Sequence, residues 1–314
     1  MALSHLIPTL SLARQAEDPQ GFAQELGASF RRYGFAVVAD HGIDAGLISQ
    51  AWALTQKLFE LPEATKRGYF DAAIAGQRGY TPFGTEIAKD AAYVDLKEFW
   101  HVGRNLPVGH RFRDHMPDNI WPAELPEFQS VFTALYAAFD AAGNKLLSAI
   151  ARDLGLTPDW FEPRVADGNS VMRLLHYPPI PPEAPGIRAG AHGDINLITL
   201  LLGAEEGGLQ LLTREGEWLS ITPPEGALVI NVGDMLERLT NHVLPSTVHR
   251  VLNPPPERRH IPRYSMPFFL HLASDVLIET LPGCISAERP NRYPDPITAN
   301  DFLVQRLIEI GLKK

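Results

Sequence analysis

The stretch AHGDINLITLLL, residues 191–202, places two ionisable side chains at the start of a run that is apolar enough to be a buried strand. In a strand, residues i and i+2 share one face, so His192 and Asp194 are expected to point in the same direction. Ionisable groups seldom enter such a run unless something pairs with them. A second histidine, His249, lies in STVHRV, which is another candidate strand.

These three side chains indicate a metal site. Two imidazoles and one carboxylate on one side of an ion leave its other positions open, which suits non-haem Fe(II) and O2 chemistry. Zinc also uses two histidines and a carboxylate, with a water, for hydrolysis, so the three residues do not separate iron from zinc. A hydrogen-bonded structural pair is the alternative interpretation of His192 and Asp194.

A guanidinium and a hydroxyl share one face of a later strand, RYSMPFFL, where Arg263 and Ser265 are again two positions apart. An arginine that faces inward needs an anion. A bound dicarboxylate would supply one, because the guanidinium can bind a carboxylate with two hydrogen bonds and the hydroxyl can add a third. A salt bridge from Arg263 to an acidic neighbour is the alternative.

The composition limits the classes of protein to consider. The chain has 314 residues, of which 45% are apolar and 21% charged, as is ordinary for a soluble globular protein. Its net charge of −9 argues against a nucleic-acid or anionic-membrane partner. The single cysteine excludes an intrachain disulfide, and we find neither a signal-peptide pattern nor a membrane-span candidate. We expect a cytoplasmic protein whose partner is a small-molecule substrate; the oligomeric state stays open.

Helices are predicted at both ends and in the middle of the chain. Residues 18–34 begin with the N-cap candidate Asp18 and end at Gly34, and residues 44–61 repeat the pattern before Pro62. A short strand and turn, FAVVADHG, separates them. The longest helix is predicted over 126–155, where one apolar stripe must pack against a wide surface such as a sheet. A closing helix is predicted within 298–311.

After about residue 168, short apolar runs alternate with glycine and proline turns. Eight such runs predict a sandwich or jelly roll. In a jelly roll, the strands between Asp194 and His249 would bring that histidine back onto the same inner face.

In its motifs, the chain resembles the iron(II)/2-oxoglutarate-dependent oxygenases of the isopenicillin N synthase-like group. The matching text is LLHYPP, HGDINLITLLL, GGLQLL, GEWLSITPPEGALVINVGDMLERLTN, STVHRV and RYSMPFF, preceded by GFAVVADHGI, FELPEATKRGY, RGYTPFGTE and KEFW. The resemblance implies an α+β fold with a double-stranded β-helix (jelly roll) core, flanked by N-terminal and long supporting helices. We expect an N-terminal helical and mixed region (1–165) packing on the core (166–275), with a C-terminal segment and helix (276–314), as one structural unit.

The resemblance also implies roles for individual residues. His192, Asp194 and His249 would ligate Fe(II), and Arg263 and Ser265 would hold the distal carboxylate of the co-substrate 2-oxoglutarate. Tyr177 would hydrogen-bond near the iron-bound end of the co-substrate. Where many relatives carry an asparagine two residues before this tyrosine, this chain has Leu175, so one polar contact is missing. No catalytic residue beyond the metal centre is expected, and five polar residues are interpreted as structural: His41, His176, Asn231, Asp234 and Asn241.

The implied activity is oxidation of a small molecule by O2, through hydroxylation, desaturation or cyclisation, with release of succinate and CO2. An Fe(II) oxidase of the same fold that does not use 2-oxoglutarate, a zinc hydrolase and a non-enzymatic dicarboxylate sensor are the alternatives. Because both imidazoles must be unprotonated, iron affinity is expected to fall below about pH 6. Segments 76–104 and 285–314 are expected to lie outside the barrel and cover its mouth. Five of their residues fit an anionic or aromatic substrate: Arg78, Tyr80, Phe83, Lys97 and Trp100.

Overall fold

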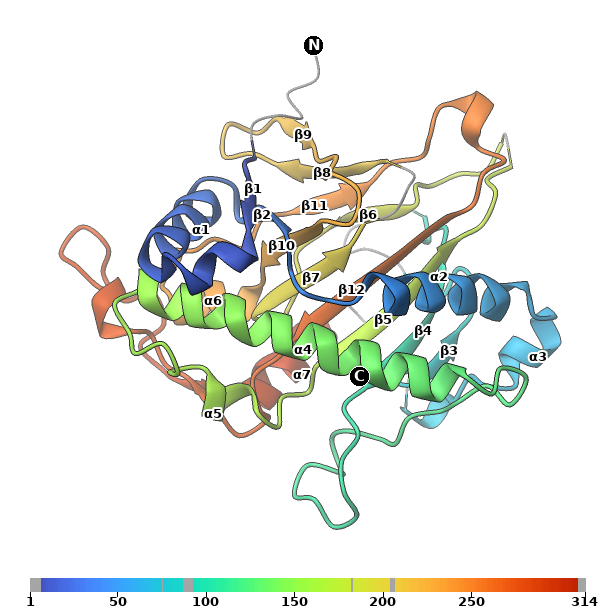
Figure 1. Cartoon of the computed structure of the whole chain (residues 1–314), viewed down its shortest axis with the longest axis horizontal. Coiled ribbons are helices and arrows are strands. Elements are labelled where there is room, and N and C mark those ends of the chain that lie inside the picture. Colours follow the sequence, from blue (N-terminus) through green and yellow to red (C-terminus); the bar gives the residue numbers. More distant parts are fainter. Residues whose placement is uncertain (1–6, 75, 87–92, 182, 204–206, 310–314) are drawn as a thin grey trace.

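The computed structural model describes residues 7–74, 76–86, 93–181, 183–203 and 207–309. Its strands form an eight-stranded sheet and a four-stranded sheet that face each other, with a separate two-stranded sheet (Figure 1). A buried apolar cluster with members from both of these facing sheets, including Val229 and Leu211, lies between them. These two facing sheets confirm the predicted jelly-roll core.

The large sheet has the strand order β1-β2-β10-β7-β12-β5-β4-β3, and only its β1–β2 pair is parallel. Its strands are β1 (Thr9–Ser11), β2 (Phe35–Ala39), β3 (Gly79–Thr81), β4 (Glu98–Gly103), β5 (Val171–Tyr177), β7 (Ile198–Leu202), β10 (Leu228–Val232) and β12 (Arg263–Leu270). Segment 76–104 therefore does not lie outside the barrel as expected: β3 and β4 extend the large sheet beyond β5. Polar residues in these two short strands interrupt the apolar alternation, so the sequence did not predict that they join the large sheet.

The small sheet has the order β6-β11-β8-β9. Its strands are β6 (Ala189–His192), β8 (Leu209–Leu212), β9 (Trp218–Ser220) and β11 (His249–Val251). All eight apolar runs that were predicted as strands after residue 168 form strands of these two sheets. The β13 (Leu277–Ile278) and β14 (Ile297–Thr298) pair lies apart from both.

The predicted helices are confirmed as α1 (Pro19–Tyr33), α2 (Ala45–Glu60), α4 (Phe128–Asp153) and α7 (Ala299–Glu309). Asp18 accepts a hydrogen bond from the Gly21 amide at the start of α1, as an N-cap residue does. Gly34 ends that helix with a φ of 68°, a conformation that glycine adopts without steric cost. The remaining short helices are α3 (Glu63–Arg67), α5 (Glu162–Val165), α6 (Asp234–Leu239) and the 3-10 turns η1 (Leu12–Ala16), η2 (Ala72–Ile74), η3 (Pro256–Arg258) and η4 (Pro282–Cys284).

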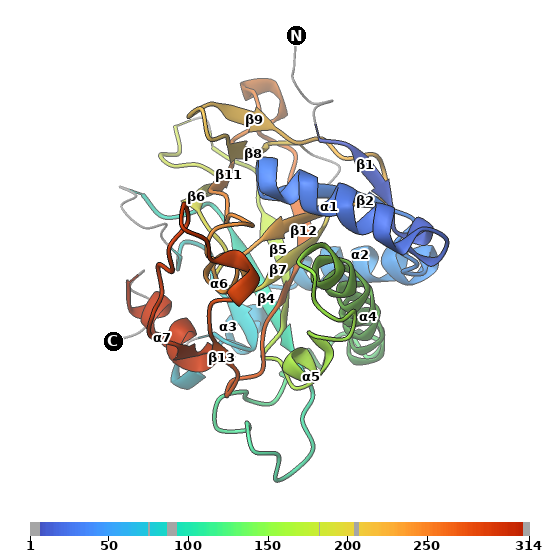
Figure 2. The ribbon, with the colours of Figure 1, turned by 90° about the vertical axis from the view of Figure 1, so that its left-hand side faces the viewer.

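Helices α1, α2 and α4 cover the face of the large sheet that points away from the small sheet (Figure 2). The apolar stripe of α4 packs against β12, β4 and β7, as its width predicted. Phe139 of α4 stacks on Phe268 of β12 with ring centroids 5.5 Å apart and planes 4° from parallel. Because this helical layer buries the outer face of the large sheet, polar side chains of the candidate site can lie on the inner face. No described helix is long and apolar enough to cross a membrane.

Truncating the stacked aromatic tests this helix–sheet contact. Phe139 is completely buried, so Phe139→Ala is expected to lower the free energy of unfolding by about 3–5 kcal/mol through lost burial and an unfilled cavity. Urea denaturation measures this change. Val108→Ala, at a residue that is 95% exposed, is the control and should leave the urea concentration at the midpoint of unfolding unchanged. A similar small effect in both variants would contradict the packing described.

Candidate metal centre and the residues around it

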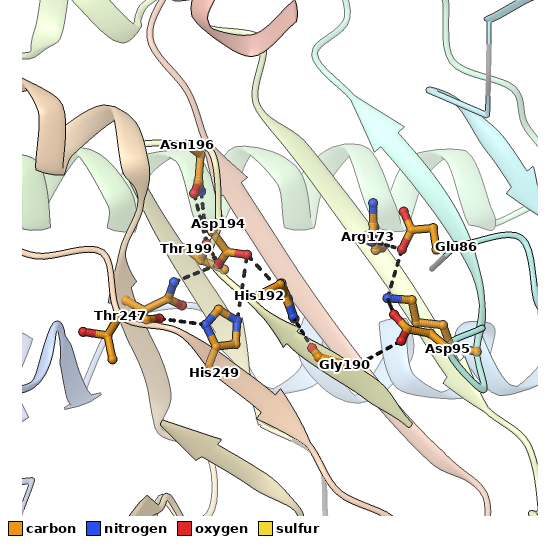
Figure 3. A network of polar contacts seen from close by, with 12 residues as sticks. Glu86, Asp95, Arg173, Gly190, His192, Asp194, Asn196, Thr199, Thr247 and His249 are labelled. Atoms are coloured by element: carbon orange, nitrogen blue, oxygen red, sulfur yellow. Dashed lines mark hydrogen bonds and ion pairs between the residues drawn. The ribbon is translucent and has the colours of Figure 1, made fainter. Parts of the chain in front are cut away.

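The three predicted ligands converge between the two sheets (Figure 3). His192 ends β6 and His249 begins β11, and the two residues are direct antiparallel partners in the small sheet. Asp194 lies two residues beyond the end of β6, where the chain crosses towards the large sheet. This one strand pairing brings together two histidines that are 57 residues apart in the sequence.

Their donor atoms lie at distances that one ion could span. Asp194 Oδ1 is 3.9 Å from His192 Nε2 and 3.9 Å from His249 Nε2. The ligand atoms of all three residues lie within 4.8 Å of one another. Two ligands about 2.1 Å from a shared ion can be separated by up to about 4.2 Å, so small side-chain adjustments would complete the coordination.

Hydrogen bonds set the imidazole tautomers. Nδ1 of His192 donates to the Gly190 carbonyl at 2.7 Å, and Nδ1 of His249 donates to the Thr247 carbonyl at 3.2 Å. Because each Nδ1 carries the proton, each Nε2 keeps its lone pair and faces Asp194. Proteins commonly orient metal-ligating histidines through such a hydrogen bond from the other ring nitrogen.

Two side chains of the large sheet hold the Asp194 carboxylate. Oδ2 accepts hydrogen bonds from Thr199 Oγ1 at 2.5 Å and from Asn231 Nδ2 at 2.8 Å, which leaves Oδ1 facing the histidines. Thr199 on β7 and Asn231 on β10 are paired residues in the sheet. Asn231 was predicted to be structural, and no sequence motif indicated a role for Thr199. Only the β7–β10 register, which the sequence does not state, places both beside Asp194.

The environment favours the protonation states that ligation requires. Burial, with a smaller contribution from the neighbouring His249, lowers the pKa of His192 to about 4. This imidazole therefore stays unprotonated at a lower pH than the ordinary histidine pKa suggests. Burial alone would raise the pKa of Asp194, but the two histidines and the hydrogen bonds from Asn231 and Thr199 hold it below its usual value.

The predicted co-substrate residues lie on the inner face of the large sheet. Arg263 and Ser265 are buried on β12, with the guanidinium Nη1 donating to Ser265 Oγ at 3.2 Å. Across the strand pair, Tyr177 is opposite Arg263 and Leu175 is opposite Ser265. The Arg263 guanidinium lies 5.1 Å from the Tyr177 ring centroid. The structure thus brings these three polar residues together, with Tyr177 beside the arginine.

The other residues interpreted as structural make structural contacts. His41 bonds the Gly226 carbonyl, and His176 bonds Glu98 and stacks on Tyr264 on the helix-covered face. Asp234 pairs with Arg306, and Asn241 bonds backbone carbonyls at 284 and 290.

The residues suggested for substrate recognition divide between the two faces of the sheet. Tyr80 and Trp100 belong to the buried core under the helices, so they do not face the metal side. Arg78 is almost completely buried, and Phe83 is 44% exposed. Lys97 is two residues before Phe99, which packs in the cluster between the sheets, so it shares that inner face.

Two family models match the chain. One, described as the 2OG-Fe(II) oxygenase superfamily, matches residues 168–272 and includes the three candidate ligands. The other, described as the N-terminal region of a non-haem dioxygenase in morphine synthesis, matches residues 7–124.

Curated relatives extend this similarity over most of the chain. The 2-oxoglutarate-Fe(II) type oxidoreductase hxnY of Emericella nidulans is 31% identical over 293 residues, which cover 89% of this chain and 82% of hxnY. The proline hydroxylase buaE of Petromyces alliaceus is 32% identical over 308 residues, covering 92% of this chain and 93% of buaE.

Solved structures have the same fold. A protein assigned to the 2OG-Fe(II) oxygenase family from Caulobacter crescentus is 61% identical, with a TM-score of 0.91 and coverage of 97% of this chain and 99% of that chain. A full-length Neurospora crassa protein in complex with alpha-KG is 31% identical, with a TM-score of 0.86 and coverage of 96% of this chain and 95% of that chain.

A close backbone approach beside Asp194 provides a test of this geometry. A Cβ on Gly233 would lie 2.2 Å from the Asn196 carbonyl oxygen, so Gly233→Ala must displace the segment that carries Asp194. We expect a loss of about 1–3 kcal/mol in unfolding free energy together with weaker divalent-metal binding, measured by Co(II) titration. Gly283→Ala is the control, because a Cβ there would meet nothing within 4 Å. Unchanged metal affinity in Gly233→Ala would mean that Asp194 does not depend on this contact.

Proposed function

The chain belongs to the 2OG-Fe(II) oxygenase superfamily, and from this premise we propose which of its side chains carry out the chemistry. It is a non-haem Fe(II)- and 2-oxoglutarate-dependent oxygenase that uses O2 and releases succinate and CO2. We assign the iron to His192, Asp194 and His249. The observation that carries this assignment is the pair of oriented imidazoles, each with an unprotonated Nε2 3.9 Å from one carboxylate oxygen.

We assign the distal carboxylate of 2-oxoglutarate to Arg263 and Ser265. A buried cation beside a hydroxyl, on the inner face of the sheet, offers charge-assisted hydrogen bonds to a carboxylate. Tyr177, opposite Arg263, would add a contact to the same co-substrate. When bound, iron supplies the activation of O2 for oxidation of a substrate C–H bond. The chain's own contribution is to orient the ligands through Thr199 and Asn231 and to limit water between the sheets.

Related proteins act on small molecules, as the name of the proline hydroxylase states, and a small molecule is the substrate class that the comparisons support. A cytoplasmic location and the absence of nucleic-acid or membrane partners stay predictions from the sequence. We also propose that the regions 1–165, 166–275 and 276–314 form one structural unit, since strands from the first two share the large sheet.

Removing the carboxylate ligand tests the metal assignment. Asp194→Ala leaves two imidazoles, which hold Fe(II) poorly, so iron binding and succinate formation should both be lost while the fold remains. Anaerobic Fe(II) titration and circular dichroism measure the two effects. Asp234→Ala is the matched control, since this nearby carboxylate pairs with Arg306 instead. Full activity of purified Asp194→Ala protein would refute the assignment.

Replacing the arginine tests the co-substrate assignment. Arg263→Leu removes hydrogen bonds to a charged group, worth about 1.5–3 kcal/mol, and leaves the carboxylate unpaired. The KM for 2-oxoglutarate should rise roughly tenfold to a few hundredfold, with iron content near that of the wild type. A keto acid with an apolar tail should recover part of the lost turnover.

Succinate formation against 2-oxoglutarate concentration, with a melting curve, measures these effects. A purely structural salt bridge would instead give a lower melting temperature and an unchanged KM. Substrate oxidation without succinate would favour an oxidase that dispenses with 2-oxoglutarate, and binding without turnover would favour a sensor.

A further inference from the structure

A group of charged and polar side chains lies on the inner face of the large sheet, separate from the residues assigned above. We call it the Arg173 cluster: Glu86, Asp95, Lys97, His101 and Arg173. Lys97 Nζ pairs with Glu86 Oε2 at 2.9 Å and with Asp95 Oδ2 at 2.8 Å. Arg173 Nη1 pairs with the same Glu86 oxygen at 3.1 Å. The cluster therefore links β4, β5 and the segment before β4.

The strand register places this cluster beside the metal ligands. Thr199, which bonds Asp194, pairs across the sheet with Phe269, and the Arg173 guanidinium lies 5.4 Å from the Phe269 ring centroid. On its other side, Asp95 Oδ1 accepts the Gly190 amide hydrogen, and the Gly190 carbonyl accepts the His192 Nδ1 hydrogen. Figure 3 shows the cluster connected to the ligands through Gly190. A substrate beside the iron would lie next to this group.

The Arg173 guanidinium is fixed in orientation before any substrate arrives. It lies 4.1 Å from the Phe99 ring centroid, and its Nε donates to His101 Nε2 at 2.7 Å. His101 accepts because its Nδ1 donates to the Gly76 carbonyl. The third guanidinium nitrogen, Nη2, makes no hydrogen bond with a described residue, and the side chain is 18% exposed.

Glu86 presents a matching acceptor. Both of its ion pairs use Oε2, and within the described part of the chain Oε1 receives no hydrogen bond. Its side chain is 16% exposed, whereas Lys97 and Asp95 behind it are 8% and 7% exposed. One donor, Arg173 Nη2, and one acceptor, Glu86 Oε1, are therefore available from two side chains in contact.

The charges in the cluster cancel. Lys97 and Arg173 are balanced by Glu86 and Asp95, and His101 is held neutral by burial and by the adjacent Arg173, which lower its pKa well below the usual value. A substrate carboxylate would thus find no spare cation and would lie next to Glu86, where like charges repel. A neutral group with both an acceptor and a donor avoids this cost.

We propose that Arg173 and Glu86 recognise a neutral, planar substrate that presents a carbonyl oxygen and an adjacent N–H, as a lactam or another amide does. The carbonyl accepts from Arg173 and the N–H donates to Glu86. Lys97, Asp95 and His101 are positioning residues that hold this pair. The anionic substrate that the sequence left open is disfavoured. This inference rests on the proposed function, because the iron defines where the substrate lies.

The test uses 2-pyridone, which carries a ring C=O next to N–H, as the probe. Calorimetry measures its binding to the full-length protein loaded anaerobically with Fe(II) and 2-oxoglutarate. N-methyl-2-pyridone, which lacks the N–H, and benzoate, which is anionic, are the comparison probes. We expect 2-pyridone to bind in the millimolar range or tighter and both comparison probes to bind at least about tenfold more weakly.

Three variants assign the effect to the pair. Arg173→Gln should weaken 2-pyridone binding about tenfold to a hundredfold. Arg173→Lys keeps the positive charge but loses the planar guanidinium and its fixed hydrogen-bond directions, so it should also weaken binding. Glu86→Gln leaves the cluster with one excess positive charge, so it should shift the preference towards benzoate. Arg104→Gln is the control, because that arginine pairs with Asp140 outside the cluster and should leave probe binding unchanged.

The outcomes separate the two proposals. Circular dichroism confirms folding, and the anaerobic Fe(II)–2-oxoglutarate absorption band reports the metal and co-substrate sites independently of the probe. If the band is absent from the wild type, the proposed metal and co-substrate sites are wrong. If the band is present but 2-pyridone does not bind, binds equally to Arg173→Gln, or binds more weakly than benzoate, the substrate inference is overturned.

Discussion

The buried Asp194 carboxylate is the constraint on which the rest of the site depends. A carboxylate between two sheets is unfavourable unless its oxygens are satisfied. This chain satisfies one oxygen with Thr199 and Asn231 and leaves the other for the two imidazoles. That division requires β7 and β10 to be paired in one register, because a slip of one residue between them would turn one of the two side chains towards the helices. The sheet pairing and the ligand geometry are therefore one structural requirement.

The helical layer makes this requirement compatible with a stable fold. Helices α1, α2 and α4 bury the apolar residues on the outer face of the large sheet. The inner face can then carry Arg263, Ser265, Thr199 and the Arg173 cluster without being the main source of stability. Alternation along each strand separates these tasks: on β5, Met172 and Leu174 pack under the helices, whereas Arg173 and Tyr177 face the small sheet.

Much of this arrangement could be predicted from sequence because it depends on local spacing. Arg263 and Ser265 share a face of β12 by their two-residue separation, and the apolar stripe on α4 predicted a sheet beneath it. His192 and Asp194 do lie together as predicted, but Asp194 is beyond the end of β6, so the turn of the chain places it there and strand alternation does not. The supporting residues could not be predicted in the same way. Asn231 acquires its role from strand pairing, and β3 and β4 are short strands whose polar inner residues break the apolar alternation. The charge balance around Lys97 also depends on Glu86 and Arg173, which are distant from one another in sequence and carry no shared motif.

The origin of the ligands from two different sheets has a thermodynamic consequence. His192 and His249 belong to the small sheet, whereas Thr199 and Asn231, which bond Asp194, belong to the large sheet. A bound ion would therefore connect the two sheets. An ion that binds only the folded chain adds to its stability in proportion to the logarithm of its free concentration. Bound iron would thus raise the free energy of unfolding of the protein as well as support its turnover.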